Sequence, residues 1–231
     1  MSGLRGEKLL QAWELSRELP EQEAVLALLE LAWPDCARSE WARMPLGERN
    51  ALLLELRAAT LGRHMETIAK CPACGALLEC TLDAVDLAEQ LREQAAEAKS
   101  AAGALRPATT EDLLAAATAD DDQGAQRILL ARTADCHGAE KSDATAVAVL
   151  EEFERVNGAA EIRLELECPG CPARPVMDLD IAQFLLREIA GAALRLMAEI
   201  HELARAYGWS EQSIAAMSPA RRAAYLEMLG V

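Results

Sequence analysis

Cys71-Pro72-Ala73-Cys74 recurs later in this chain as Cys168-Pro169-Gly170-Cys171, and these two motifs decide the fold. Each places two thiols on one tight turn, and Gly75 after the first motif and Gly170 within the second supply permissive backbone. Four thiolates together satisfy the tetrahedral coordination of a structural Zn²⁺ site. The motifs therefore predict one structural Zn²⁺ held by Cys71, Cys74, Cys168 and Cys171.

Strand-like stretches flank both motifs, at residues 77–82, 162–166 and 176–179. Two short hairpins that hold one metal would form a zinc ribbon. The dipeptides Leu82-Asp83 and Leu179-Asp180 each follow a motif and lead into a helical segment. This local repeat favours two equivalent halves that meet at one metal.

The separation of the motifs leaves two alternatives open. About 90 residues lie between them, whereas a compact ribbon has roughly 15–20. The cysteines could instead be reduced thiols in buried turns. A redox Cys-x-x-Cys is the other alternative, although that site needs a helix N-terminus and usually a single motif.

The other cysteines are interpreted as small core residues, which is the common role of single buried thiols. Cys36 falls at a helix junction and Cys80 in a strand, so neither is assigned to the metal. Cys136-His137 is a minor alternative as a stray ligand pair.

Composition excludes several classes of function. A net charge of −15 over 231 residues argues against nucleic-acid binding, because affinity for phosphate backbones depends on Lys and Arg. No apolar signal segment and no membrane-spanning run is present. Reduced, metal-type cysteines fit the cytoplasm, which is the location we expect.

The fold class predicted is mainly α with a small β part (α+β), a helical protein with a split zinc ribbon. The chain divides into five regions: an N-terminal helical region (1–66), the first half of the ribbon (67–85), a helical insertion (86–160), the second half of the ribbon (161–180), and a long helix with a C-terminal helical tail (181–231).

The longest helix should run from about Ile181 to Tyr207, because apolar residues recur there at helical spacing. Ile189, Leu196 and Leu203 should be buried. Gly191 within this helix costs about 1 kcal/mol relative to Ala, so we expect it to allow another helix to approach closely.

Within the insertion, residues 88–102 are charged and rich in Ala, without a strong apolar face, which indicates a solvated helix. Thr109 and Asp112 have the spacing of a capping box. Ser142 or Asp143 should cap a later helix.

No catalytic constellation is recognisable. The histidines His64, His137 and His201 lie in unrelated contexts, and there is no phosphate-binding loop. A four-thiolate zinc leaves no coordination position for water or substrate. We therefore expect a protein that is not an enzyme and has no small-molecule substrate.

Four segments of the C-terminal third carry a family resemblance: Asp-Ile-Ala-Gln-Phe-Leu (180–185), Glu-Ile-His-Glu-Leu-Ala (199–204), Ala-Tyr-Gly-Trp (206–209) and Met-Ser-Pro-Ala-Arg-Arg-Ala-Ala-Tyr-Leu (217–226). With Leu-Gly-Glu-Arg-Asn (46–50) and Leu-Glu-Leu-Arg (54–57) ahead of the first motif, the chain resembles the T4-like phage baseplate hub assembly chaperone family, as found in extracellular contractile injection systems. One departure is Pro172 after Cys171, where the first motif has Gly75.

The resemblance implies a role in assembling the baseplate or its central hub, by binding hub or spike proteins and without catalysis. A zinc-stabilised cytoplasmic adaptor unrelated to phage tails is the alternative. A zinc enzyme would need one ligand exchanged for water.

The tail offers candidate contacts, because aromatic and Arg side chains are the usual anchors of protein interfaces. Packing of the tail against the long helix is the competing interpretation, above all for the first two of these residues. The candidates are Tyr207, Trp209, Arg221, Arg222 and Tyr225.

Overall fold

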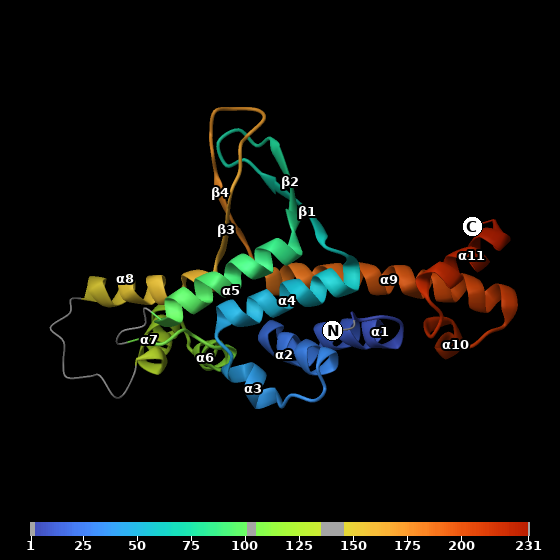
Figure 1. Ribbon diagram of the computed structural model, residues 1–231, viewed down its shortest axis with the longest axis horizontal. Helices are drawn as coiled ribbons and strands as arrows, with labels where there is room; N and C mark the ends of the chain where they lie inside the picture. Colours follow the sequence, from blue (N-terminus) through green and yellow to red (C-terminus); the bar gives the residue numbers. More distant parts are fainter. Residues whose placement is uncertain (1–2, 101–104, 135–145, 231) are drawn as a thin grey trace.

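The computed structural model describes residues 3–100, 105–134 and 146–230, which are mostly helical and carry two small antiparallel sheets (Figure 1). This architecture agrees with the α+β class that the sequence predicts. Among the helices in this part of the chain, none combines the length and the hydropathy needed to cross a membrane.

The helices form an elongated body from which the strands project (Figure 1). Their bounds are α1 Glu7–Glu18, α2 Glu21–Ala32, α3 Arg38–Arg43, α4 Leu46–Leu61, α5 Ala84–Ser100, α6 Thr110–Ala116, α7 Asp122–Thr133, α8 Ala146–Asn157, α9 Ile181–Tyr207, α10 Glu211–Ala215 and α11 Pro219–Leu229.

Helix α9 is the axis of this body, with α1 and α4 packed along it and α10 and α11 at its C-terminal end (Figure 1). The Asp180 side chain accepts from the Gln183 amide at its start, and Gly208 ends it in the left-handed conformation, at φ 69°. Ile189, Leu196 and Leu203 are buried, as predicted.

Helix α5 corrects the expectation of a solvated helix. It lies along α4 and buries Ala84, Ala88, Leu91 and Ala95. Leu91 is the one large apolar residue among these four, so the sequence gives little indication of a buried helix face. Small side chains nevertheless let two helices pack closely, and the insertion is attached to the body through this contact.

Gly191 does not admit another helix, and that expectation is wrong. A Cβ at this position would meet only Nη1 of Arg195, at 3.4 Å. Gly191 lies instead on a face of α9 that lines a groove.

Capping predictions within the insertion are confirmed where the structure describes them. The Thr109 side chain and the Asp112 side chain form the predicted capping box at the start of α6. Asp112 is fully buried and also pairs with Arg106 and Arg132, which joins α6 to α7. Ser142 and Asp143 lie outside the described residues.

The strands form two hairpins that rise from one side of the body as an arm (Figure 1). Strand β1 (His64–Lys70) pairs with β2 (Leu77–Asp83), and β3 (Ile162–Glu165) pairs with β4 (Val176–Leu179). Three of these strands match the strand-like stretches of the sequence. Strand β1 was not identified there, and it begins within the region assigned to the N-terminal helices.

A buried arginine holds the base of this arm. Arg57 of α4 forms a two-pronged ion pair with Glu188 of α9, at 2.7 and 2.8 Å. The same guanidinium donates to the carbonyl oxygens of Gly62 and His64, at 2.5 and 2.6 Å, where the chain turns from α4 into β1. One side chain therefore fixes two helices and the first strand together.

Replacing Arg57 by Ala should lower the free energy of unfolding by about 3 kcal/mol, because Glu188 and two carbonyls would lose their partner. Urea denaturation measures the change. Arg163→Ala is the matched control: its ion pairs with Glu161 and Asp178 are exposed, and such pairs contribute at most about 1 kcal/mol. Equal losses in the two variants would contradict the role given to Arg57.

Candidate metal centre

The first Cys-x-x-Cys motif forms the turn that joins β1 to β2. The Cys71 amide donates to the Ala76 carbonyl and the Gly75 amide to the Cys71 carbonyl, both at 2.8 Å. Gly75 has φ 76°, a left-handed conformation that favours glycine. Both thiols of the motif consequently lie on one tight turn at the tip of the hairpin.

The second motif forms the loop that joins β3 to β4. The Leu166 amide donates to the Pro175 carbonyl, and the Cys168 amide donates to the Ala173 carbonyl. The Gly170 amide points at the Cys168 sulfur, at 3.3 Å. Pro172 follows Cys171 without displacing that thiol from the cluster, so the departure from the first motif removes no candidate ligand.

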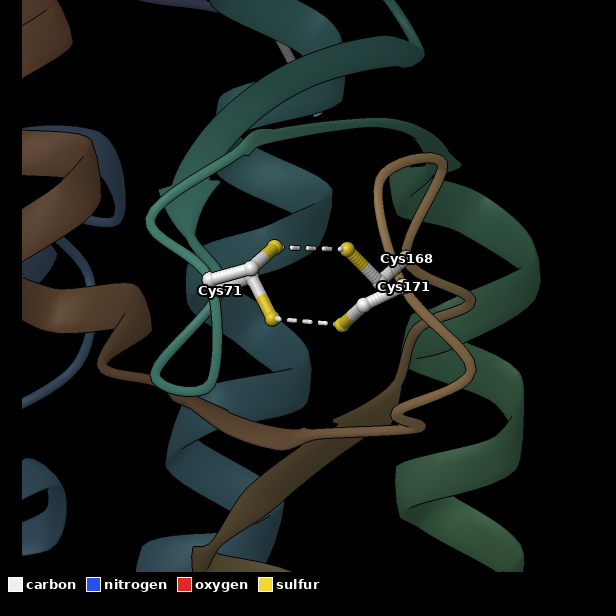
Figure 2. Close-up of side chains that lie close together, drawn as sticks. Cys71, Cys168 and Cys171 are labelled. Carbon is white, nitrogen blue, oxygen red and sulfur yellow. Dashed lines mark hydrogen bonds between the residues drawn. The ribbon is translucent and has the colours of Figure 1, made fainter.

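The two turns face each other, and all four sulfur atoms lie within 4.8 Å of one another. Figure 2 shows Cys71 opposite Cys168 and Cys171 across the gap between the turns. The Sγ atoms of Cys71 and Cys171 are 3.8 Å apart, and those of Cys74 and Cys168 are 3.5 Å apart. Four sulfurs at about 2.3 Å from one ion are about 3.8 Å apart. The tetrad is therefore close enough to bind a metal ion.

Gly170 allows the two turns to come this close. A Cβ at this position would lie 3.1 Å from the Ala76 Cβ and 3.4 Å from the Cys74 sulfur. Any larger residue would push the second turn away from the first. Gly170, which the sequence pattern indicates only as a permissive turn residue, is thus also needed for the contact between the two motifs.

The thiols compete for protons in a way that a cation would relieve. Amides of its own turn, that of Ala73 foremost, lower the pKa of Cys71 to about 7. The Ala76 amide favours the Cys74 thiolate, but hydrogen bonds with the thiols of the opposite motif prevail and raise the pKa of Cys74 to about 12. Four thiolates cannot coexist without a positive charge between them, and a divalent ion supplies it.

The other metal-ligating residues of the sequence stay apart from the tetrad. Cys36 lies between α2 and α3 and Cys80 in β2; both are free and half-buried. His64 and His201 are exposed and belong to no cluster of potential ligands within the described residues. Cys136 and His137 lie outside those residues.

The candidate contact residues of the tail form one aromatic cluster at the far end of α9. The rings of Tyr207 and Trp209 stack with centroids 4.5 Å apart. Tyr225 meets both edge-on, at 5.7 and 4.9 Å. The Arg221 guanidinium lies over the Tyr225 ring, 5.7 Å from its centroid, and Arg221 is exposed.

Arg222 is placed differently from Arg221. It is buried, its Nε lies 2.5 Å from Oε2 of Glu199, and its Nη1 donates to the Met217 carbonyl at 2.7 Å. This ion pair attaches α11 to α9, and nothing in the sequence near Arg222 or Glu199 indicates it, because the two residues are 23 positions apart.

No protein-family model, curated protein or solved structure matches the chain.

Cys168→Ser should lower the free energy of unfolding by at least ~2 kcal/mol in metal-loaded protein, because metal binding and folding of the hairpin tips are coupled. Thermal melting with parallel metal analysis measures both effects. Cys80→Ser is the matched control, since that thiol lies outside the tetrad. An unchanged melting curve for Cys168→Ser would exclude a structural metal here.

Metal affinity should rise steeply with pH, because a raised thiol pKa means that a proton must leave before the sulfur can bind. Titration with a competing chelator between pH 6 and 8 should show more than one proton released per ion. A pH-independent affinity would contradict binding through these thiols.

Proposed function

We propose that the chain is a non-enzymatic assembly factor or component of the baseplate hub of a contractile phage tail or injection system. The proposal rests on the resemblance of the quoted segments, which lie on both sides of the insertion. In this role the protein acts in the cytoplasm by binding hub or spike proteins. The observation that carries the non-enzymatic part is the all-thiol tetrad, since four thiolates around one ion leave no position for a substrate.

The metal we propose is Zn²⁺. An all-sulfur, tetrahedral donor set suits zinc, whereas magnesium and calcium require oxygen ligands. The two hairpins with their facing Cys turns then make a zinc ribbon that is split by the helical insertion. Purified protein should contain about one zinc per chain.

In this role zinc would hold the tips of the two hairpins together. In the part of the chain that the structure describes, the hairpins pair only within themselves, β1 with β2 and β3 with β4. Two-stranded hairpins are marginally stable in water, so an ion that joins their tips would hold the arm in one shape. A fixed shape lowers the entropic cost of binding a partner.

The tail is the surface proposed for the hub contact. The aromatic cluster of Tyr207, Trp209 and Tyr225 combines rings with the exposed guanidinium of Arg221, and rings and Arg dominate binding energy at interfaces. Arg222 supports this surface from below through Glu199. Arg221 is thus the residue whose change tests the contact without undoing the fold.

Arg221→Glu should reduce co-purification with the hub and spike proteins by about tenfold, while zinc content and melting stay unchanged. Arg127→Glu, an exposed arginine of α7, is the control and should retain binding. Arg222→Ala should instead loosen the tail and lower the melting temperature. Wild-type protein that binds zinc but recovers neither hub nor spike would favour the adaptor alternative.

A further inference from the structure

A groove of about 830 Å³ lies in the corner between the projecting arm and helix α9. Its lining comes from β1, from the β3–β4 hairpin, and from α9. Figure 1 shows that the two hairpins join the body at separate places and converge at their tips. The groove is separate from the four thiols and from the aromatic cluster of the tail. Its three walls differ in chemistry.

The first wall is an open strand edge. Residues 66–70 of β1 all line the groove. A strand that turned one face to the groove would contribute every second residue, so five consecutive residues indicate that its edge faces the groove. Within the described residues β1 pairs with β2 alone. The backbone groups on its other side are available to a further strand.

The second wall is apolar. Leu164, Leu166, Met177 and Leu179 of the β3–β4 hairpin line the groove, at alternate positions that share one side of the strands. All four are half-buried. This side of the hairpin is therefore only partly covered by the rest of the arm.

The floor is basic. Arg187, Gly191 and Arg195 follow one another at successive turns of α9, and Nη1 of Arg195 lies 3.4 Å from the place where a Cβ of residue 191 would be. Both arginines are exposed, and neither forms an ion pair within the described residues. Lys70 at the end of β1 is a third cation of the lining, and it too forms no ion pair with any residue that the structure describes.

Most carboxylates that line the groove are already engaged. Glu188 binds Arg57, the Asp180 side chain caps α9, and Asp178 lies 3.9 Å from Arg163. Glu66 is left against the three free cations. The lining as a whole has four basic and four acidic side chains, so the groove is close to neutral in a chain with a net charge of −15.

We propose that this groove binds an extended, acidic segment of a partner protein as a third strand on the edge of β1. The segment's apolar side would cover the half-buried side of the β3–β4 hairpin, and its carboxylates would meet Arg187 and Arg195. Main-chain pairing supplies affinity in this mode, and side-chain positions supply specificity. The inference rests on the proposed function as a protein-binding chain, and it adds a second contact surface with its own partner chemistry.

A nucleic acid is the other anion that a groove with a basic floor could take. The open β1 edge and the apolar wall favour a peptide, because a phosphate backbone uses neither. The charge of the whole chain would also repel a polyanion.

The test uses fluorescent peptides of about eight residues, the length of an ordinary strand, in which Val alternates with Glu or, as the matched peptide, with Lys. The Val–Glu peptide should bind zinc-loaded, full-length protein by anisotropy, and added salt should weaken it. Arg187→Glu with Arg195→Glu should weaken binding at least tenfold, while zinc content stays constant. Arg17→Glu with Arg205→Glu is the control of equal charge change at exposed positions outside the groove.

Hydrogen exchange reports the binding mode. Amides of residues 66–70 should gain protection with the Val–Glu peptide, whereas a simple ionic contact with α9 would leave them unchanged and overturn the added strand. Equal affinity for the Val–Lys peptide, or binding of a single-stranded oligonucleotide in place of the peptide, would also overturn the proposal. Hub recovery that survives the Arg187/Arg195 variant removes the groove from the hub contact and leaves the proposed function intact. If the wild type binds the peptide but recovers no hub protein, the groove proposal stands and the proposed function fails.

Discussion

Four thiols must meet although two of them, Cys71 and Cys171, are 100 positions apart, and much of the fold follows from that constraint. The chain between the motifs has to leave the arm and return to the same place. It leaves as α5 along α4 and returns through residues 158–160, beside both helices. Gly47 makes room for the return, since a Cβ there would lie 2.8 Å from that of Ala159. Asn50 then holds the Ala160 carbonyl at 2.9 Å.

Helix α9 supports both the arm and the tail through carboxylates. Glu188 receives Arg57 at the base of the arm, and Glu199 receives Arg222 beneath the tail. Both guanidinium groups are nearly buried, and a buried charge that loses its partner is strongly destabilising. The polar side of α9 is thus a set of attachment points for the arm and the tail, while its apolar side forms the core.

Short-range patterns in the sequence predict the features that depend on neighbouring residues, namely turns, helix bounds and helix caps. The Cys motifs predict the two turns, the apolar spacing predicts α9 from Ile181 to Tyr207, and the Thr109 capping box predicts the start of α6. The features that the sequence does not predict are contacts between residues that lie far apart in the chain. Arg57–Glu188 joins residues 131 positions apart, and nothing in either neighbourhood indicates the other. Strand β1 escaped notice because only Met65 is buried along it, so its alternation of apolar and polar residues is weak.

Metal binding should affect the groove more strongly than the aromatic cluster of the tail. The groove has the β1 edge on one side and the β3–β4 hairpin on the other, and these strands belong to separate sheets. The thiol tetrad at the hairpin tips is where both hairpins contribute to one site, so an ion there would set the width of the groove. The tail is attached through Arg222 and Glu199 at the other end of α9 (Figure 1). Loss of the metal should therefore disturb peptide binding in the groove long before it disturbs the aromatic cluster of the tail.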